Sequence, residues 1–366
     1  MNLKEKIGQL FILGFHGTTV SADLAHMLSS HKPGGVILFA RNLADPIQVA
    51  TLANELQSHS PATPLWISID HEGGTVFRFQ NGLTPLPASG ELGRHNSEEL
   101  VTSVASVGAC ELSAIGVNVN YAPVLDLNTN PDNPVIGERS FGADPEKVSR
   151  LGLAIIMAYH EQRIMACGKH FPGHGDTDAD SHHELPVVSL SAERLREREC
   201  RPFHTLITKG LPAIMTAHVQ YPQLDKHYPA SLSRLIQTGL LREQLRFNGL
   251  IFSDDLEMSA IIDHTDICEA AIIAIEAGTD HLLICHDDKR QTAAMNAVYK
   301  AVTDGRIAMS RIDASFNRII HYKKQYAFPH VPTDPATVKK LVGIAAHRHI
   351  VDRVYTTASA SSLYSA

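Results

Sequence analysis

The sequence contains little cysteine, and the cysteines it has form no recognisable framework. There are five in 366 residues, an odd number with no C-x-x-C pair. This pattern argues against a disulfide-stapled fold and against a thiolate zinc site. The positions are Cys110, Cys167, Cys200, Cys268 and Cys285. A reducing compartment therefore fits the chain best.

Long apolar runs and blocks of basic residues are also missing. No stretch approaches the roughly 20 apolar residues of a membrane-spanning helix. No Lys/Arg block is suited to a phosphate backbone in a chain of net charge -7. We therefore expect no membrane and no nucleic-acid partner.

The N-terminus superficially imitates a signal peptide. Lys4 and Lys6 precede the apolar run Ile7–Phe15, but Gln9 interrupts the run and no small-residue cleavage site follows. The segment instead predicts a first helix running into a first strand. A cytoplasmic protein is the expectation.

The composition, 44% hydrophobic and 19% charged, is typical of a folded protein with a large core. Short β-branched apolar runs alternate with longer segments of helical period, as in repeated βα units. The candidate strands are Leu10–Gly14, Gly35–Phe39, Leu65–Ile69, Val117–Ala122, Met165–Gly168, Ala213–Thr216, Leu250–Ser253 and His281–Cys285.

These runs predict parallel strands, because they are apolar at successive positions and so suit burial on both faces. Eight parallel strands in one domain favour a (β/α)8 TIM-type barrel. An open doubly wound sheet is the alternative, but no G-x-G-x-x-G follows the first strand to support it.

The predicted barrel occupies residues 1–328 as a single domain. Beyond it, Pro329, Pro332 and Pro335 break the pattern, and an amphipathic segment at 336–354 leads into a Ser/Ala-rich end. We expect residues 329–366 to form a short C-terminal helical extension with a disordered tail.

Polar residues directly follow five successive candidate strands. One alone is explained more simply as a hydrogen-bonded structural group. Five together favour a single pocket, because catalytic groups of such barrels stand at the C-terminal strand ends. They are Asp70-His71-Glu72 after the third strand, Asp126 after the fourth, Lys169-His170 after the fifth, His218 after the sixth and Asp254-Asp255 after the seventh.

The most specific signal is the segment from Lys169 to His182, K-H-F-P-G-H-G-D-T-D-A-D-S-H. It resembles the loop of the bacterial β-N-acetylglucosaminidases of glycoside hydrolase family 3, the NagZ-type enzymes of peptidoglycan recycling. Thr75 departs from the family, which usually has a basic residue there. Other matches over most of residues 1–328 are Asp70-His71-Glu72-Gly73-Gly74 with Arg78, Gly137-Glu138-Arg139-Ser140-Phe141, Met215-Thr216-Ala217-His218 and Phe252-Ser253-Asp254-Asp255-Leu256-Glu257-Met258.

The resemblance implies that Asp254 is the nucleophile, and a carboxylate at a strand end can hold a covalent glycosyl intermediate. Its neighbour Asp255 should point to the other side of the strand as a structural carboxylate. His182 resembles the family's general acid/base, with Asp180 as its partner. Two residues apart on an extended segment, the pair projects to one side, and an imidazole can donate and accept a proton near neutrality.

The resemblance also implies a set of sugar-binding residues. Charged hydrogen bonds to hydroxyl groups are strong and fix a sugar in place. The simpler interpretation is a set of ion pairs around the barrel rim. The residues are Asp70, Arg78, Arg139, Lys169 and His170.

A metal site formed by His170, His174, His182 and His183 is the other interpretation of the loop. A Gly-rich loop with several aspartates is a poor metal cage, so we expect no metal and no cofactor. His174 and His183 should set the loop conformation, and His218 should belong to the pocket wall.

The resemblance implies a retaining exo-β-N-acetylglucosaminidase that acts on peptidoglycan fragments, GlcNAc-1,6-anhydroMurNAc and muropeptides. The alternatives are a family 3 β-glucosidase, a β-glycoside phosphorylase, or a catalytically silent sugar-binding barrel. A one-domain chain favours the first, because relatives acting on glucosides or xylosides commonly take their acid/base from a second domain. A small carbohydrate is the expected partner, and the chain should be a monomer.

Overall fold

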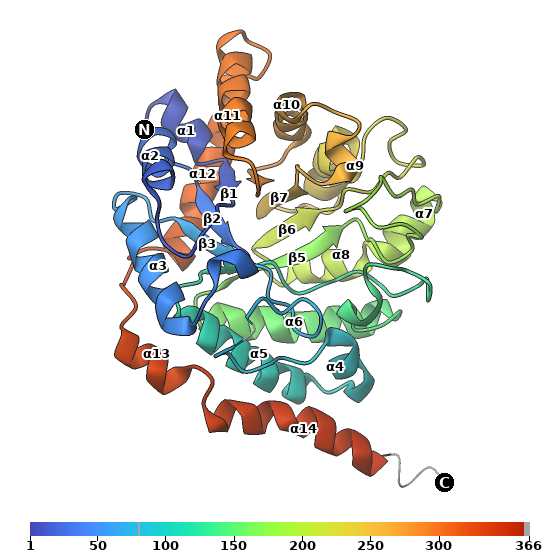
Figure 1. Cartoon of the computed structure of the whole chain (residues 1–366). Helices are drawn as coiled ribbons and strands as arrows, with labels where there is room; N and C mark the ends of the chain where they lie inside the picture. The colour runs from blue at the N-terminus through green and yellow to red at the C-terminus, as the bar shows by residue number, and fades with distance from the viewer. Residues whose placement is uncertain (80, 362–366) are drawn as a thin grey trace.

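The computed structural model describes residues 1–79 and 81–361, with a barrel at the centre (Figure 1). In these residues eight parallel strands follow one another around the barrel, and β8 closes it on β1. The predicted (β/α)8 architecture is confirmed. The strands are β1 (Phe11–Leu13), β2 (Gly35–Leu38), β3 (Trp66–Ile69), β4 (Val119–Asn120), β5 (Met165–Phe171), β6 (Ala213–Thr216), β7 (Leu250–Asp255) and β8 (His281–Ile284).

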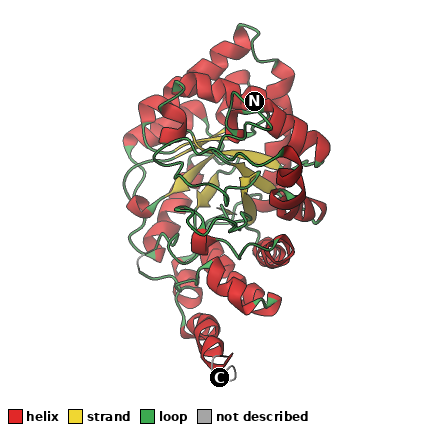
Figure 2. Ribbon diagram, turned by 90° about the vertical axis from the view of Figure 1, so that its right-hand side faces the viewer, coloured by secondary structure: helices red, strands yellow, loops and turns green. Residues whose placement is uncertain are grey.

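Helices surround the barrel on all sides that Figure 2 shows. The α-helices are α1 (Leu3–Gly8), α2 (Ala22–His31), α3 (Pro46–Ser58), α4 (Ser89–His95), α5 (Glu98–Ala114), α6 (Pro145–Glu161), α7 (Ala192–Arg194), α8 (Arg201–Thr208), α9 (Ser259–Ile262), α10 (Ile267–Ala277), α11 (Asp288–Thr303), α12 (Met309–Tyr326), α13 (Pro335–Leu341) and α14 (Ala345–Ser361). The 3-10 helices are η1 (Ala40–Asn42), η2 (Gly137–Arg139) and η4 (Ala230–Leu232), and the π-helices are η3 (Leu195–Glu199) and η5 (Leu235–Gln244).

Local sequence explains where three of the helices begin. Asp45, Asp144 and Asp334 each cap a helix whose first residue is proline, and each side chain accepts a backbone N–H of the first turn. Proline at this position loses no hydrogen bond, and the carboxylate satisfies a free donor. The Asp-Pro pairs therefore fix the starts of α3, α6 and α13.

Two strands run further than their apolar runs predict. β5 continues through Lys169 and His170 to Phe171, and β7 ends at Asp255 rather than Ser253. Lys169, His170, Asp254 and Asp255 are charged or polar, which hides their strand character from a hydrophobicity pattern. The extension of these strands carries polar side chains to the C-terminal rim of the barrel.

The C-terminal extension lies along the outside of α3, α4 and α5, as the red helices of Figure 1 show. Its buried residues Val338, Val351 and Val354 belong to the same apolar cluster as the barrel's own side chains. α14 reaches Ser361, so helix continues into the Ser/Ala-rich end. The predicted disordered tail concerns in part residues 362–366, which lie outside the described residues.

Residues 1–79 and 81–361 contain no helix that is long and apolar enough to cross a membrane. All five cysteines are free thiols, and three of them are buried. The thiols therefore contribute to packing rather than to cross-links.

A buried carboxylate fastens the N-terminal rim of the barrel at the start of β8. Asp280 is fully buried, and its oxygens lie 2.6 Å from Arg242 Nη2 and 2.6 Å from Arg318 Nη1. Ser315 Oγ and the Ile251 N–H also donate to it. Burial alone would raise the pKa of Asp280, but the arginines outweigh it and lower the pKa.

We predict that Asp280→Asn lowers the free energy of unfolding by about 3 kcal/mol at neutral pH, because it leaves three partly buried arginines without their counter-charge. A carboxyl group whose pKa is lowered on folding stabilises the protein above its unfolded pKa of about 3.9, and this stabilisation is lost as the pH falls through the folded value. Urea unfolding of both proteins should give a constant difference between about pH 7 and 5 that narrows only below about pH 4. Narrowing already above about pH 5 would contradict the account.

Candidate functional site

A cavity of about 400 Å³ opens at the C-terminal ends of β2, β3, β6, β7 and β8. This is the end at which barrels of this architecture carry their sites. It is lined by Ile37, Phe39, Asp70, Arg78, His182, Met215, Asp254, Asp255, Glu257, Met258, Ser259, Leu283, Cys285 and His286. Four residues predicted from the sequence therefore meet here: Asp70, Arg78, His182 and Asp254.

Asp254 stands at the end of β7 as a partly buried carboxylate. Burial acts to raise its pKa, but His218 and His170 act more strongly in the opposite direction, together with the Asp255 N–H that donates to Oδ1 at 2.8 Å. The result is a pKa of about 2. At neutral pH Asp254 is an anion, suited to attack an electrophile and not to donate a proton.

His182 reaches the same cavity from the long loop between β5 and α7. Its Nδ1 lies 2.7 Å from Asp180 Oδ1, which also accepts the His182 N–H at 2.9 Å. Partial burial of Asp180 opposes these contacts, but they lower the pKa of its carboxyl group. With Nδ1 held by a carboxylate, Nε2 is the nitrogen that can exchange a proton with a ligand.

A buried ion network supports the cavity wall behind Asp70. Lys169 Nζ lies 2.6 Å from Asp70 Oδ1 and 2.7 Å from Glu72 Oε1, and Arg139 binds both Glu72 oxygens at 2.8 and 2.9 Å. Burial raises the pKa of Glu72, but the two cations outweigh it and lower the pKa. Lys169 and Arg139, predicted as sugar-binding residues, thus lie behind the wall, whereas Asp70 and Arg78 form part of it.

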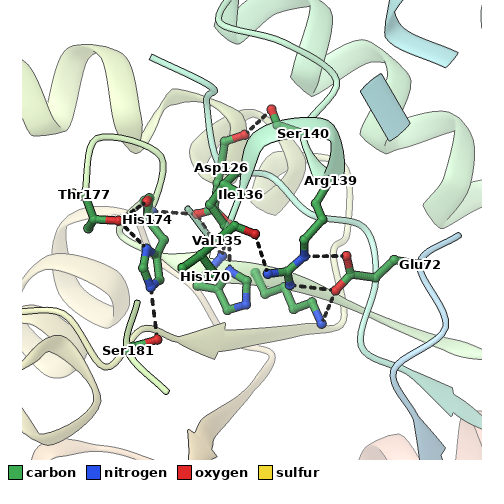
Figure 3. Close-up of polar contacts among 12 residues, drawn as sticks. Glu72, Asp126, Val135, Ile136, Arg139, Ser140, His170, His174, Thr177 and Ser181 are labelled. Carbon is green, nitrogen blue, oxygen red and sulfur yellow. Dashed lines mark hydrogen bonds and ion pairs between the residues drawn. The ribbon is translucent and has the colours of Figure 1, made fainter. Parts of the chain in front are cut away.

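Asp126, after β4, connects β5 to the loop that follows it (Figure 3). Its fully buried carboxylate lies 2.6 Å from His170 Nδ1, and it accepts the His170 N–H at 3.1 Å and the His174 N–H at 2.7 Å. Burial would raise the pKa of Asp126, but His170 reverses the effect and lowers it. His170, also predicted to bind sugar, is therefore fixed in orientation by its neighbour.

His174 connects Asp126 to later residues of the loop, in agreement with the loop-conformation role expected from the sequence. Its Nδ1 lies 2.9 Å from Thr177 Oγ1 and its Nε2 lies 3.2 Å from Ser181 Oγ. Burial, followed by the charge of His170, lowers its pKa to about 4, so the ring is neutral at physiological pH. Ser181 is held next to His182 by this contact.

His218 lies in the wall of the site behind the end of β7. Burial lowers its pKa, so the neutral ring donates from Nε2 to the Asp255 carbonyl at 2.9 Å, and its Nδ1 accepts from Ser231 Oγ at 2.6 Å. These two contacts hold the backbone beside Asp254.

The prediction that Asp255 points away from the cavity is wrong, because Asp254 and Asp255 both line it. The pairing of β7 with β8 shifts register between Phe252 and Asp255, and such an irregularity breaks the strict alternation of a strand. The carboxylate is still engaged in structure: it accepts the Glu257 N–H at 3.1 Å and lies 3.2 Å from His286 Nε2.

Sequence reasoning missed the contribution of β2 and β8. His286 follows β8, packs its ring 5.6 Å from that of Phe39, and lies 3.4 Å through Nδ1 from Arg41. Arg41 in turn stacks over Phe39 at 4.4 Å. Phe39 and His286 stand just beyond the C-terminal ends of the second and eighth strands, the same kind of position from which Asp70 and Asp254 are predicted.

A larger cavity of about 1170 Å³ lies between α2 and the start of α11. It shares only the wall residues Glu257 and His286 with the smaller one. The chemistry is assigned to the smaller cavity because Asp254 and His182 line it and neither lines the larger one.

Within residues 1–79 and 81–361, no group of three or more His, Cys, Asp or Glu side chains is arranged to hold a metal ion. The rings of His170 and His174 are 5.7 Å apart, but each Nδ1 is engaged, one with Asp126 and the other with Thr177.

Sequence comparison finds relatives among the glycosyl hydrolases. The sequence model of the glycosyl hydrolase family 3 N-terminal domain matches residues 2–322. A β-hexosaminidase of Thiobacillus denitrificans is 42% identical over 281 residues, which are 75% of this chain and 77% of the relative.

Solved structures extend the likeness to the fold. A family 3 β-N-acetylglucosaminidase from Paenibacillus sp. strain FPU-7 is 41% identical with a TM-score of 0.91, over 97% of this chain and 68% of that one. NagZ from Neisseria gonorrhoeae, solved with N-trifluoroacetyl-D-glucosamine, is 32% identical with a TM-score of 0.77, over 94% and 96% of the two chains.

We predict that Asp126→Ala loosens the loop while the barrel stays folded. The substitution removes the acceptor of the His174 N–H, so amide exchange at His174 should accelerate roughly 10- to 100-fold, which corresponds to the loss of about 1–3 kcal/mol for a buried hydrogen bond. Hydrogen exchange followed by mass spectrometry measures this. Asp178→Ala, in the exposed part of the same loop, is the control and should leave the rate unchanged; equal exchange in all three proteins would contradict the role of Asp126.

Proposed function

Since the chain belongs to glycosyl hydrolase family 3 and is a glycoside hydrolase of the β-N-acetylhexosaminidase type, we propose that it is a retaining exo-β-N-acetylglucosaminidase. In this proposal Asp254 is the nucleophile and His182, oriented by Asp180, is the general acid/base. The observation that carries it is that Asp254 and His182, from different parts of the chain, line one cavity. The cavity volume lies at the lower end of the range of roughly 300–1,000 Å³ for small-ligand sites, which fits one sugar ring.

The first step proposed is transfer of the sugar to the protein. An Asp254 carboxylate oxygen attacks the anomeric carbon as the bond from that carbon to the leaving oxygen breaks. His182 Nε2–H gives its proton to that oxygen, so the aglycone leaves as a neutral alcohol and the imidazole becomes neutral. The low pKa of Asp254 supports the nucleophilic role, because a carboxylate is needed for it.

The second step returns the protein to its starting state. Neutral His182 accepts a proton from water, the water oxygen bonds to the anomeric carbon, and the bond to Asp254 breaks. Two inversions at one carbon give net retention of configuration. Asp180 stabilises the imidazolium that is present at the start and the end of the cycle.

The proposed sugar-binding residues divide into two groups. Asp70 and Arg78 line the cavity and are 3.6 Å apart, so they can share hydroxyl groups of one sugar ring. Lys169, Arg139 and His170 are the supporting group. Lys169 pairs with Asp70, Arg139 pairs with Glu72, and His170 pairs with Asp126. Substitution of a wall residue should therefore weaken sugar binding more than substitution of a supporting residue.

The proposed natural substrates are peptidoglycan fragments with a terminal non-reducing β-linked N-acetylglucosamine, namely GlcNAc-1,6-anhydroMurNAc and muropeptides. Support comes from the likeness to NagZ, whose structure holds an N-acylated glucosamine analogue. The cytoplasm, as expected from the free thiols, is the proposed place of action.

We predict that Asp254→Ala lowers kcat/KM on an aryl β-N-acetylglucosaminide by about 10⁴-fold or more. His182→Ala should lower it by roughly 10²- to 10⁴-fold for a phenol that needs protonation, and much less for dinitrophenol, which leaves without it. Steady-state rates with a series of aryl leaving groups measure both effects. An equal loss across the series would count against His182 as the acid.

We also predict that the wild-type protein hydrolyses aryl β-N-acetylglucosaminide and not aryl β-glucoside. Product analysis with and without inorganic phosphate separates hydrolysis from phosphorolysis, since a phosphorylase forms a sugar 1-phosphate. Binding of N-acetylglucosamine without turnover of any activated glycoside would instead indicate a silent sugar-binding barrel.

A further inference from the structure

Four hydrogen bonds from two distant segments converge on one buried carboxylate, Glu111 of α5, which is 1% exposed. Thr84 donates from its N–H and from Oγ1, both at 2.7 Å. Gly343 donates its N–H at 2.9 Å, and His347 Nδ1 lies at 2.7 Å. A buried carboxylate requires such partners, so Glu111 ties residues of the loop after β3 to the C-terminal extension.

The extension also touches this loop directly. Gly343 has φ +64, and a Cβ added there would lie 2.2 Å from the Gly82 carbonyl oxygen. The close approach is therefore possible only for glycine. Val338, Val351 and Val354 of the extension belong to the same apolar cluster as Phe79 in the loop.

The inner side of the same loop carries Arg78 to the cavity. Arg78 lies between Phe77 and Phe79 in the chain, and both rings pack near His71, at 4.4 and 6.1 Å. Its guanidinium lies 3.6 Å from Asp70 and lines the cavity. One loop thus has the proposed sugar-binding residue on one side and the extension on the other.

We propose that the C-terminal extension positions residues 77–79 and 81–88 of this loop through Glu111, and in this way sets the affinity of the cavity for the sugar. This inference rests on the proposed function, because it takes Arg78 as a sugar-binding residue. Glu111, Gly343 and His347 are positioning residues that do not touch the substrate. They act on binding and leave the chemistry of Asp254 and His182 unchanged.

The test uses the full chain with three substitutions. His347→Ala removes one donor to Glu111, and His347→Asn restores an N–H near the position of Nδ1. Gly343→Ala keeps the donors but pushes Gly82 away. The control is Arg311→Ala. Arg311 lies in α12 near the start of β8, at the opposite end of the barrel, and the substitution removes its hydrogen bonds to Ile275, Thr279 and Ser315.

His347→Ala and Gly343→Ala should each raise KM for an aryl β-N-acetylglucosaminide by roughly three- to tenfold and change kcat by less than about twofold, because binding common to ground and transition state is lost. Amide exchange over 81–88 should accelerate in both. His347→Asn should recover most of the wild-type KM, and Arg311→Ala should lower the melting temperature without changing KM.

Unchanged KM together with unchanged exchange over 81–88 in His347→Ala and Gly343→Ala overturns the inference, as does a similar KM rise in Arg311→Ala. If Gly343→Ala does not fold, the comparison of His347→Ala with His347→Asn decides alone. The two proposals fail in different ways: a wild-type protein without activity on the glycoside contradicts the proposed function, whereas an active one whose KM ignores the extension contradicts only this inference.

Discussion

The pairing of buried charges at the C-terminal strand ends is the constraint on which the site depends. Glu72 and Asp126 are buried carboxylates, and each is surrounded by cations or N–H donors that keep it ionised. An unpaired member of such a set is costly, so each group holds its partners in one arrangement. At the active end, Glu72 fixes Lys169 and Arg139, and Asp70 is positioned as a consequence.

The site therefore has a more buried part at the strand ends, which includes Asp254, and a more exposed part on the loop that carries His182. Asp254 stands at the end of β7, where its carboxylate accepts the Asp255 N–H and the Asp255 carbonyl accepts a hydrogen bond from His218. His182 has a side chain that is 61% exposed and depends on loop residues for its position. Asp126 and His174 connect the two levels, since they tie the start of the loop to the barrel and its far part to Ser181. The proposed nucleophile is therefore positioned by the barrel, and the proposed proton donor is positioned by a loop that the barrel anchors.

Most of the barrel could be predicted because a parallel strand buried on both faces is a continuous apolar run. The same rule hid the ends of β5 and β7, where Lys169 and Asp254 continue the strand in charged residues. Asp70, Arg78, Asp254 and His182 were found from motifs, and the cavity unites them. The sequence could not separate wall residues from supporting residues. That division depends on the fold, in which Glu72 pairs with Lys169 and Arg139 while Arg78 lines the cavity.

Residues that act through distant contacts left weaker signals. Phe39 and His286 follow β2 and β8, whereas the prediction from the sequence rests on the ends of the third to seventh strands. Glu111 is a lone acidic residue on the buried face of α5, and such a residue implies partners without saying which. Its donors Thr84 and Gly343 lie 27 and 232 positions away. Only the folded chain brings them together.

Asp180 and His182 lie two residues apart on one loop and are joined by two hydrogen bonds. A carboxylate and imidazole placed on separate strands would separate whenever either element shifted. Here any displacement of the loop carries both together, so the imidazole keeps its counter-charge whether it faces the cavity or the solvent. In the proposed mechanism, the contact between Asp180 and His182 is therefore kept whatever the distance between the imidazole and the leaving oxygen.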